Sequence, residues 1–427
     1  MSALASQARV LLDCQGRTNA PSRAFQPQHM AGIAWAFAIL KFRNEPLWDA
    51  LACASVKTMG EFKAGELAGL AWACAKIGFL HQPLMDAIAS AAGTKGFQSL
   101  ELTNMAWSFA TLLVDDVPLM EALASQAVST IASFSGRQIA NSAWAFATLA
   151  CADRPLRDAL AGAAVKRIGD MRSQELSMTA WSCATWQYLH MPLLYAISAA
   201  AQIMIMDFSS QELCNTVWAF ATFGCPDAPL LQSIASAASR RILDFAPQGL
   251  AGTAWSFAAL AFEDRPLLAA LWARAVDTLQ RPEWTPQGLA TIAWAVASGA
   301  VVDGPFMAAI AARSVKSISA FGAAEVGMLA WSLSRMPDLS LAWSLLDVAD
   351  TAPFAAATRH AAFGAVLSEC EQRGAVSEQV DLMMALARGC DTDLGAAARL
   401  AAAHRAAECG FSGDVELALL ESRLRKK

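Results

Sequence analysis

The stretch that decides the fold is Asn141-Ser142-Ala143-Trp144-Ala145-Phe146-Ala147-Thr148, because close variants of it recur along the chain. Its tryptophan recurs at positions 35, 72, 107, 144, 181, 218, 255, 294 and 331, at intervals of 35 to 39 residues and most often 37. A period of this length is typical of stacked-repeat proteins, in which each unit packs only on its neighbours. The sequence therefore predicts an array of nine repeats.

Each repeat reads as a pair of helices. Ten residues before the Trp stands a bulky apolar residue such as Phe134, followed by helix-capping residue types and then by the A helix that carries the Trp. Eleven residues after the Trp, eight of nine repeats have a proline such as Pro155, which is favoured in the first turn of a helix and so opens a second, B helix. Tyr is nearly absent and Ala, a strong helix former, is abundant. We predict an all-α fold, a right-handed α-solenoid of about nine 37-residue helical hairpins plus terminal helices.

The points at which the repeat pattern begins and changes divide the chain into three segments. Residues 25–345 form the nine-repeat solenoid. Residues 1–24 read as a leftover half-repeat helix and loop, because residues 3–8 spell the same six letters as residues 122–127 of a B helix. A targeting peptide is the alternative for this segment. Residues 346–427 read as helix pairs that weakly resemble pentatricopeptide-type repeats.

Charge and motifs limit the possible functions. With 32 Lys and Arg against 37 Asp and Glu, no large basic region indicates non-specific phosphate binding, although reading of single-stranded RNA through base edges and stacking stays open. The five His are isolated and no known catalytic motif is present, so we expect neither enzymatic activity nor a cofactor. The charge-free residues 176–206 carry the Trp and Pro of an ordinary repeat, so we expect no membrane span there.

The ten cysteines are scattered along the chain without a C-x-x-C pair. Cys74 and Cys183 stand where other repeats have Phe, which indicates small core residues. We therefore expect reduced structural thiols, with no metal site and no disulfide.

A helical wheel of the A helix divides its residues into two groups. In the fourth repeat the predicted core face holds Ile139, Ala140, Ala143, Phe146 and Ala147, with Trp144 at its edge as a further core residue. The remaining arc holds Asn141, Ala145 and Thr148. Down the array these three positions are short and mostly uncharged, unlike the Glu and Lys of an ordinary solvent face. The pattern favours a ligand-reading stripe, and packing against the next repeat is the alternative.

Two segments carry a resemblance to a known family. Residues 245–258 with 264–271, and residues 208–223 with 229–231, resemble the octotricopeptide repeat, and the resemblance extends over about residues 25–345. It implies helical-hairpin repeats that bind single-stranded RNA sequence-selectively in organelle RNA stability, processing or translation. It implies a location in the mitochondrion or chloroplast, with the cytoplasm as the alternative. We expect the protein to be a monomer.

Candidate RNA-binding residues follow from the stripe, by analogy with proteins that read one base per repeat. A protein-interaction scaffold of the HEAT or tetratricopeptide kind is the alternative function, and it predicts contiguous exposed apolar or charged patches. Lys76 and Arg335 are candidate phosphate contacts. The candidate reading residues are Asn104, Thr111, Asn141, Thr148, Thr185, Asn215, Thr222, Thr291 and Ser298.

Overall fold

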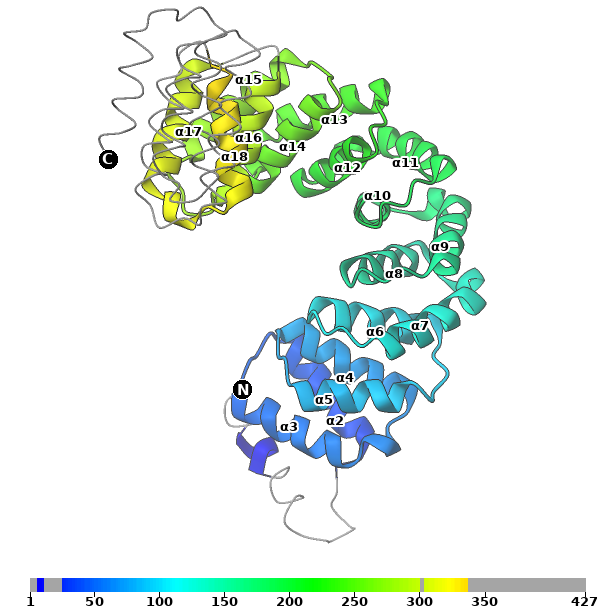
Figure 1. Cartoon of the computed structure of the whole chain (residues 1–427). Coiled ribbons are helices and arrows are strands. Elements are labelled where there is room, and N and C mark those ends of the chain that lie inside the picture. The colour runs from blue at the N-terminus through cyan, green and yellow to red at the C-terminus, as the bar shows by residue number, and fades with distance from the viewer. Residues whose placement is uncertain (1–5, 11–24, 300–302, 337–427) are drawn as a thin grey trace, which may run out of the picture. The chain divides into compact units, whose positions relative to one another are not determined.

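The computed structural model describes residues 6–10, 25–299 and 303–336 (Figure 1). Within these residues the regular structure is entirely helical, which confirms the predicted all-α class. The chain forms two compact units, Met1–Phe223 and Gly224–Lys427. Residues 6–10 of the expected half-repeat are helical. The rest of segment 1–24 and the expected C-terminal helix pairs at 346–427 lie outside the described residues.

In the first unit A and B helices alternate, as the repeat pattern predicts. The A helices are α2 (Pro27–Ile39), α4 (Ala64–Ile77), α6 (Ser99–Thr111), α8 (Gly136–Thr148), α10 (Ser173–Thr185) and α12 (Ser210–Thr222). The B helices are α3 (Glu45–Lys57), α5 (Gln82–Ala92), α7 (Val117–Thr130), α9 (Arg154–Lys166) and α11 (Met191–Ile203). Short 3-10 turns follow four of the B helices: η1 (Met59–Glu61), η2 (Ile131–Ser133), η3 (Ile168–Asp170) and η4 (Ile205–Asp207).

The second unit continues the same alternation. Its B helices are α13 (Ala228–Arg240), α15 (Arg265–Thr278) and α17 (Gly304–Lys316), and its A helices are α14 (Pro247–Ala259), α16 (Pro286–Ser298) and α18 (Ala323–Ser334). The 3-10 turns here are η5 (Ile242–Asp244) and η6 (Ile318–Ala320). Among the described helices, none is both long and apolar enough to cross a membrane.

The helices begin where the capping residues stand. In α8 the backbone N–H of Ser135 donates to Gln138 Oε1 at 2.8 Å, and the Gln138 N–H donates to Ser135 Oγ at 3.4 Å, which forms a capping box. In α9 the carboxylate of Asp153 caps the helix and Pro155 occupies its first turn, as predicted. The same B-helix caps elsewhere are Asn44, His81, Asp116, His190, Asp227, Asp264 and Asp303.

The A helices end in a recurring left-handed turn. In α8 the N–H of Cys151 donates to the carbonyl of Phe146 at 2.9 Å and that of Ala150 to Ala147 at 3.1 Å, which is the Schellman arrangement. It places Ala150 at a φ of 52°, a region that favours glycine. The equivalent residues with positive φ are Lys41, Gly78, Leu113, Gln187, Gly224 and Ala261.

The core of each unit runs between the two layers of helices. The predicted core face of α8 is buried, as are its anchor Phe134 and the B-helix residues Leu156 and Leu160. Cys74 and Cys183 are buried as expected. In both units each A helix packs far more extensively on the next A helix than neighbouring B helices pack on each other. In the first unit α6, α8 and α10 lie on the inner side of the curve that α6 to α12 follow, and α7, α9 and α11 lie on the outer side (Figure 1).

Candidate functional site

The exposed surface of the A layer is a stripe of four positions on each A helix. These positions lie seven and three residues before the Trp, at the Trp itself, and four residues after it, and they share an arc of about 60°. In α8 they are Arg137, Asn141, Trp144 and Thr148, of which the first is exposed and the others are half-buried. We call this surface the A stripe.

The structure corrects the prediction for the small residue that follows the Trp. Ala145 was expected on the open surface and is instead 0 % exposed. Its equivalents are buried in every later repeat, whereas Ala36 in the first is exposed. This pattern places the residue against the preceding A helix, and a side chain is small there because two helices meet. Packing, the alternative reading of the stripe, therefore applies to its middle position.

The Trp was expected to be a core residue, and the structure corrects this prediction too. Among the nine tryptophans of the A stripe, Trp35 is 52 % exposed and the other eight are half-buried. The rings of Trp181 and Trp218 lie 6.4 Å apart between centroids, and those of Trp294 and Trp331 also lie 6.4 Å apart. The sequence did not lead us to predict that these tryptophans lie partly at the surface. On the helical wheel Trp144 and Ala145 lie equally close to the pair Asn141 and Thr148, on opposite sides of it, so the wheel alone gives no signal that separates them.

All eleven candidate residues lie on the A stripe. Those at three residues before the Trp are half-buried, and those at four residues after it range from half-buried to exposed. The first unit brings eight candidates together on successive helices α4 to α12, namely Lys76, Asn104, Thr111, Asn141, Thr148, Thr185, Asn215 and Thr222. The second unit brings together Thr291, Ser298 and Arg335 on α16 and at the end of α18.

The threonine hydroxyls of the A stripe fall into two kinds. Thr185 Oγ1 donates to the carbonyl of Trp181 at 3.0 Å, and Thr222 Oγ1 donates to the carbonyl of Trp218 at 2.9 Å. The hydroxyls of Thr111 and Thr148 are buried without a hydrogen-bond partner. A buried hydroxyl without a partner is costly in a folded protein, so these two groups retain unused hydrogen-bonding capacity beside the Trp.

The charged residues of the A stripe are all basic. Four positions in nine repeats make 36 residues, which include Lys76, Arg137 and Arg335 and no Asp or Glu. The acidic residues next to the stripe cap the starts of their own helices, and one of them, Glu175, also lies 3.9 Å from Arg137 of the stripe, between Oε1 and Nε. Glu66, Glu101 and Glu212 accept hydrogen bonds of 2.8–2.9 Å from the N-cap N–H. The buried Glu175 accepts from Arg172 at 2.8 Å through its backbone N–H and at 2.9 Å through its guanidinium.

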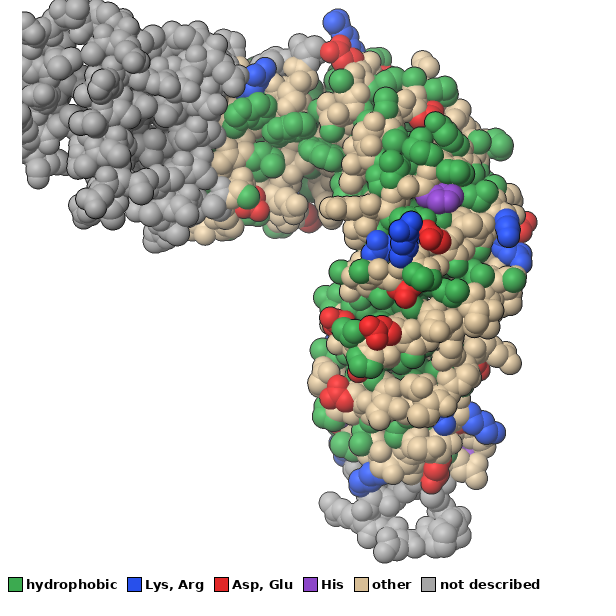
Figure 2. Space-filling view, turned by 45° about the vertical axis from the view of Figure 1, so that its right-hand side comes forward, with side chains coloured by type: hydrophobic (Ala, Val, Ile, Leu, Met, Phe, Trp, Pro, Cys, Tyr) green, Lys and Arg blue, Asp and Glu red, His purple; other side chains and the backbone are tan. Residues whose placement is uncertain are grey.

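Elsewhere on the molecule the charges are mixed. Figure 2 shows Lys and Arg side chains interspersed with Asp and Glu on a face where hydrophobic and neutral side chains predominate. Among the described residues, no group of three or more His, Cys, Asp and Glu side chains is placed to hold a metal ion. His81 and His190, which sequence reasoning left without a role, accept the N–H of Leu84 and Leu193 through Nδ1 at 3.2 Å as helix caps.

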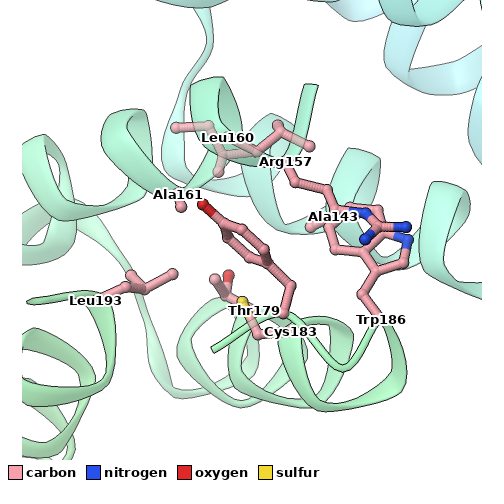
Figure 3. A pocket seen from close by; sticks show the side chains of 10 residues that line it. Ala143, Arg157, Leu160, Ala161, Thr179, Cys183, Trp186 and Leu193 are labelled. Carbon is pink, nitrogen blue, oxygen red and sulfur yellow. The ribbon is translucent and has the colours of Figure 1, made fainter. Parts of the chain in front are cut away.

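A small apolar pocket lies between the fourth and fifth repeats. The Arg157 guanidinium stands 5.5 Å from the ring centre of Trp186, and Figure 3 shows both on one side of the pocket with Cys183 and Thr179 below. Burial raises the pKa of the Cys183 thiol to about 12, so the group is a neutral packing residue rather than a nucleophile. The other residues that line the pocket are Ile139, Ala143, Leu160, Ala161, Tyr188 and Leu193, all from helices of the inter-repeat core or from the loop between them.

Residues 16–224 and 200–282 match the family described as RNA-editing substrate-binding complex 6 protein, and together they make up more than half of the 427 residues. The chain belongs to this family. The match supports a helical repeat family and does not confirm the octotricopeptide type.

Curated proteins and solved structures give little evidence about the function of this chain. No curated protein matches the chain. A homology model of the full-length AP-3 complex in an intermediate open conformation is similar at 10 % identity and a TM-score of 0.34, over 90 % of this chain and 73 % of that one. A circular tandem repeat protein with novel repeat topology is similar at 11 % identity and a TM-score of 0.19, over 98 % and 95 %. These scores are too low to support an argument about function.

Proposed function

We propose that this protein binds single-stranded RNA along the A stripe as a modular, sequence-selective reader. The observation that carries the proposal is the charge of the stripe. In a chain of net charge −5, its 36 positions hold three basic residues and no acidic one. Phosphate is the ligand group that matches this charge. In five of the nine repeats, Asn or Thr side chains beside the Trp supply the donors and acceptors that base edges require.

The family match supports an RNA ligand, because its description concerns the binding of RNA-editing substrates. In this proposal Lys76, Arg137 and Arg335 contact phosphates. The candidate Asn, Thr and Ser residues read bases, about one base per repeat. The hydroxyls of Thr111 and Thr148 are buried, so a change of side-chain rotamer accompanies the hydrogen bond that they form with RNA in this proposal.

The cellular role that we propose is organelle RNA stability, processing or translation, in the mitochondrion or chloroplast. The protein acts there as a monomeric binding protein, without a cofactor and without enzymatic activity of its own. Two findings support this role: the family description, and a repeated surface that offers contacts along a strand rather than one concave reaction site.

A titration of the full chain with a fluorescein-labelled single-stranded RNA at several salt concentrations tests the proposal. Changing Lys76→Gln or Arg137→Gln is expected to weaken binding and to reduce the slope of log affinity against log salt by about 0.7 each. Arg154→Gln is the matched control, because Arg154 is an exposed arginine on the B helix α9 and lies outside the A stripe. Equal slopes for all three variants would contradict binding along the stripe.

Sequence selectivity is tested by selection from a random RNA pool. Changing Asn141 and Thr148 together, to Ser and Asn, is expected to alter the selected sequence while the protein stays folded. An unchanged selected sequence would show that these residues do not read bases.

A protein-interaction scaffold is the second candidate function, and one observation favours it. Helix α11 and turn η4 expose the apolar side chains of Tyr195, Ile203 and Met206, with Ile203 at 87 %. Exposed apolar groups of this kind occur at protein interfaces. Changing Ile203→Glu is expected to disrupt such an interface and to leave RNA affinity unchanged, so the variant separates the two functions in a co-purification experiment.

A further inference from the structure

We propose that the tryptophans of the A stripe are stacking platforms for the bases of single-stranded RNA, with one indole offered by each repeat. This inference rests on the proposed function and adds a ligand contact that the candidate Asn and Thr residues do not provide. It concerns the position that sequence reasoning assigned to the core.

The A-helix Trp differs from the core residues of the same helix in how far its side chain is buried. In α8 the positions five residues before and two residues after the Trp hold Ile139 and Phe146, which are both fully buried. Trp144 keeps part of its ring at the surface, and Trp35 is more than half exposed. The core is therefore filled by other side chains, and the exposed part of each indole is available to a ligand.

Two pairs of successive A-stripe tryptophans have their rings close together. The Trp181–Trp218 and Trp294–Trp331 steps, one in each unit, have the same centroid distance of 6.4 Å and interplanar angles of 32° and 26°. This spacing occurs at two of the eight steps between successive A-stripe tryptophans. The distance is close to twice the rise of about 3.4 Å between stacked bases, so at these steps one base fits between two rings.

The surroundings of the rings suit a base and its phosphate. At Gly32 and Gly69, three residues before the Trp, an added Cβ would meet no atom within 4 Å, so there is open space beside these rings. The guanidinium of Arg335 stands 5.5 Å from the ring centre of Trp331, which puts a cation next to a stacking surface. Single-strand binding sites combine these two elements, aromatic rings for bases and cations for the backbone.

The Trp and the variable polar residues of the stripe have different roles in binding, for a chemical reason. Every base has a π face, so stacking is indifferent to base identity and one residue type serves every repeat. The Trp is the same in all nine repeats, whereas the positions three before and four after it change from repeat to repeat. Stacking thus supplies affinity in each repeat, and the variable polar residues supply selectivity.

The first experiment compares two ligands of equal charge on the full chain. One is a fluorescein-labelled oligouridine, and the other is a ribose-phosphate oligomer of the same length without bases. We expect the oligouridine to quench tryptophan fluorescence and to bind at least about tenfold more tightly, since stacking of even one base contributes that much. Equal affinities without quenching would overturn the stacking proposal.

The second experiment changes the ring. Trp144→Leu removes the π face and keeps an apolar side chain, and it is expected to weaken oligouridine binding about five-fold or more with an unchanged salt slope. Trp144→Phe keeps a ring and is expected to retain most of the affinity. Trp48→Phe is the control, because Trp48 is buried on the B helix α3 and is expected to leave affinity unchanged.

The outcomes separate this inference from the function on which it rests. If the wild-type protein binds oligouridine and the base-free oligomer equally, and Trp144→Leu binds like wild type, RNA binding stands and stacking is wrong. If the wild-type protein binds neither oligomer nor any sequence of a random RNA pool, both proposals fail and the A stripe is left as a protein-docking surface. Should Trp144→Leu fail to fold, the Phe variant and the base-free oligomer decide.

Discussion

A carboxylate oxygen of Asp153 accepts a hydrogen bond of 2.7 Å from the backbone N–H of Leu156 and thereby caps helix α9. We expect Asp153→Ala to destabilise this helix by about 1 kcal/mol, because the N–H loses its acceptor. Asp153→Asn is the control and is expected to retain the cap. Hydrogen exchange of the α9 amides measures the effect locally, which suits a repeat array whose parts unfold separately. Equal protection in the Ala variant would contradict a capping role.

Ala145 is expected to tolerate no larger side chain, because it is fully buried where two A helices meet. Ala145→Met should destabilise the first unit by about 1–3 kcal/mol through overpacking. The equivalent change at the exposed Ala36, in the first repeat, is the matched control and should have little effect. Urea denaturation followed by circular dichroism measures both variants. A stable Ala145→Met variant would restore the original prediction that this residue lies on the open surface.

Thr148 offers a test in which stability and binding change in different directions. Its hydroxyl is buried without a partner, so Thr148→Val is expected to leave the free energy of unfolding unchanged or to raise it. If the hydroxyl contacts RNA, the same variant binds RNA more weakly. Thr222→Val is the comparison, since that hydroxyl already donates to the carbonyl of Trp218. A Thr148→Val variant that is less stable than wild type would show that the hydroxyl has a partner within the protein.

Leu113 occupies a left-handed conformation with φ of 54° at the end of α6, and its side chain is 73 % exposed. Leu113→Gly is expected to stabilise the protein by about 0.5–1 kcal/mol, because glycine adopts this region without strain. Gly78 holds the same place after α4 with φ of 69°, so Gly78→Ala should destabilise by a similar amount. Melting temperatures of the pair should therefore move in opposite directions.

Cysteine labelling tests the assignment of the thiols to the core. Burial raises the pKa of both the Cys74 and the Cys183 thiol to about 12, so neither forms a thiolate at neutral pH. Cys53 is exposed and is expected to be alkylated in the native protein, while the two buried thiols stay unmodified until the protein unfolds. Peptide mass spectrometry after brief treatment with iodoacetamide measures this order. Rapid modification of Cys183 would indicate that the pocket beside it opens.

Local chemistry made most of the fold predictable. The period of the Trp, the capping residues before each helix and the proline at the start of each B helix act within a few residues, so they can be read from the chain alone. The capping role of the histidines could also have been predicted. His81 and His190 stand two residues before the proline, where Asp153 stands in the fourth repeat. Their role as caps follows from that position.

The A stripe was only partly predictable, for a physical reason. A helical wheel shows which residues share a face, but not where the neighbouring repeat lies. Ala145 is small because another helix packs on it, whereas Asn141 and Thr148 are short and lie at the surface. On a single wheel these two causes of a small side chain look the same. The Trp was misassigned for the converse reason, because a large aromatic side chain is usually core.

The unequal packing of the two layers has a mechanical consequence. The A helices hold most of the contacts between repeats, and the B helices touch one another much less. When the first unit bends, the gaps between B helices are the easiest to widen or close, and the A layer changes least. The spacing of neighbouring A helices is therefore expected to be the most constant dimension of the unit. A strand bound along the A layer would therefore be held with a nearly constant distance between its contacts on successive repeats.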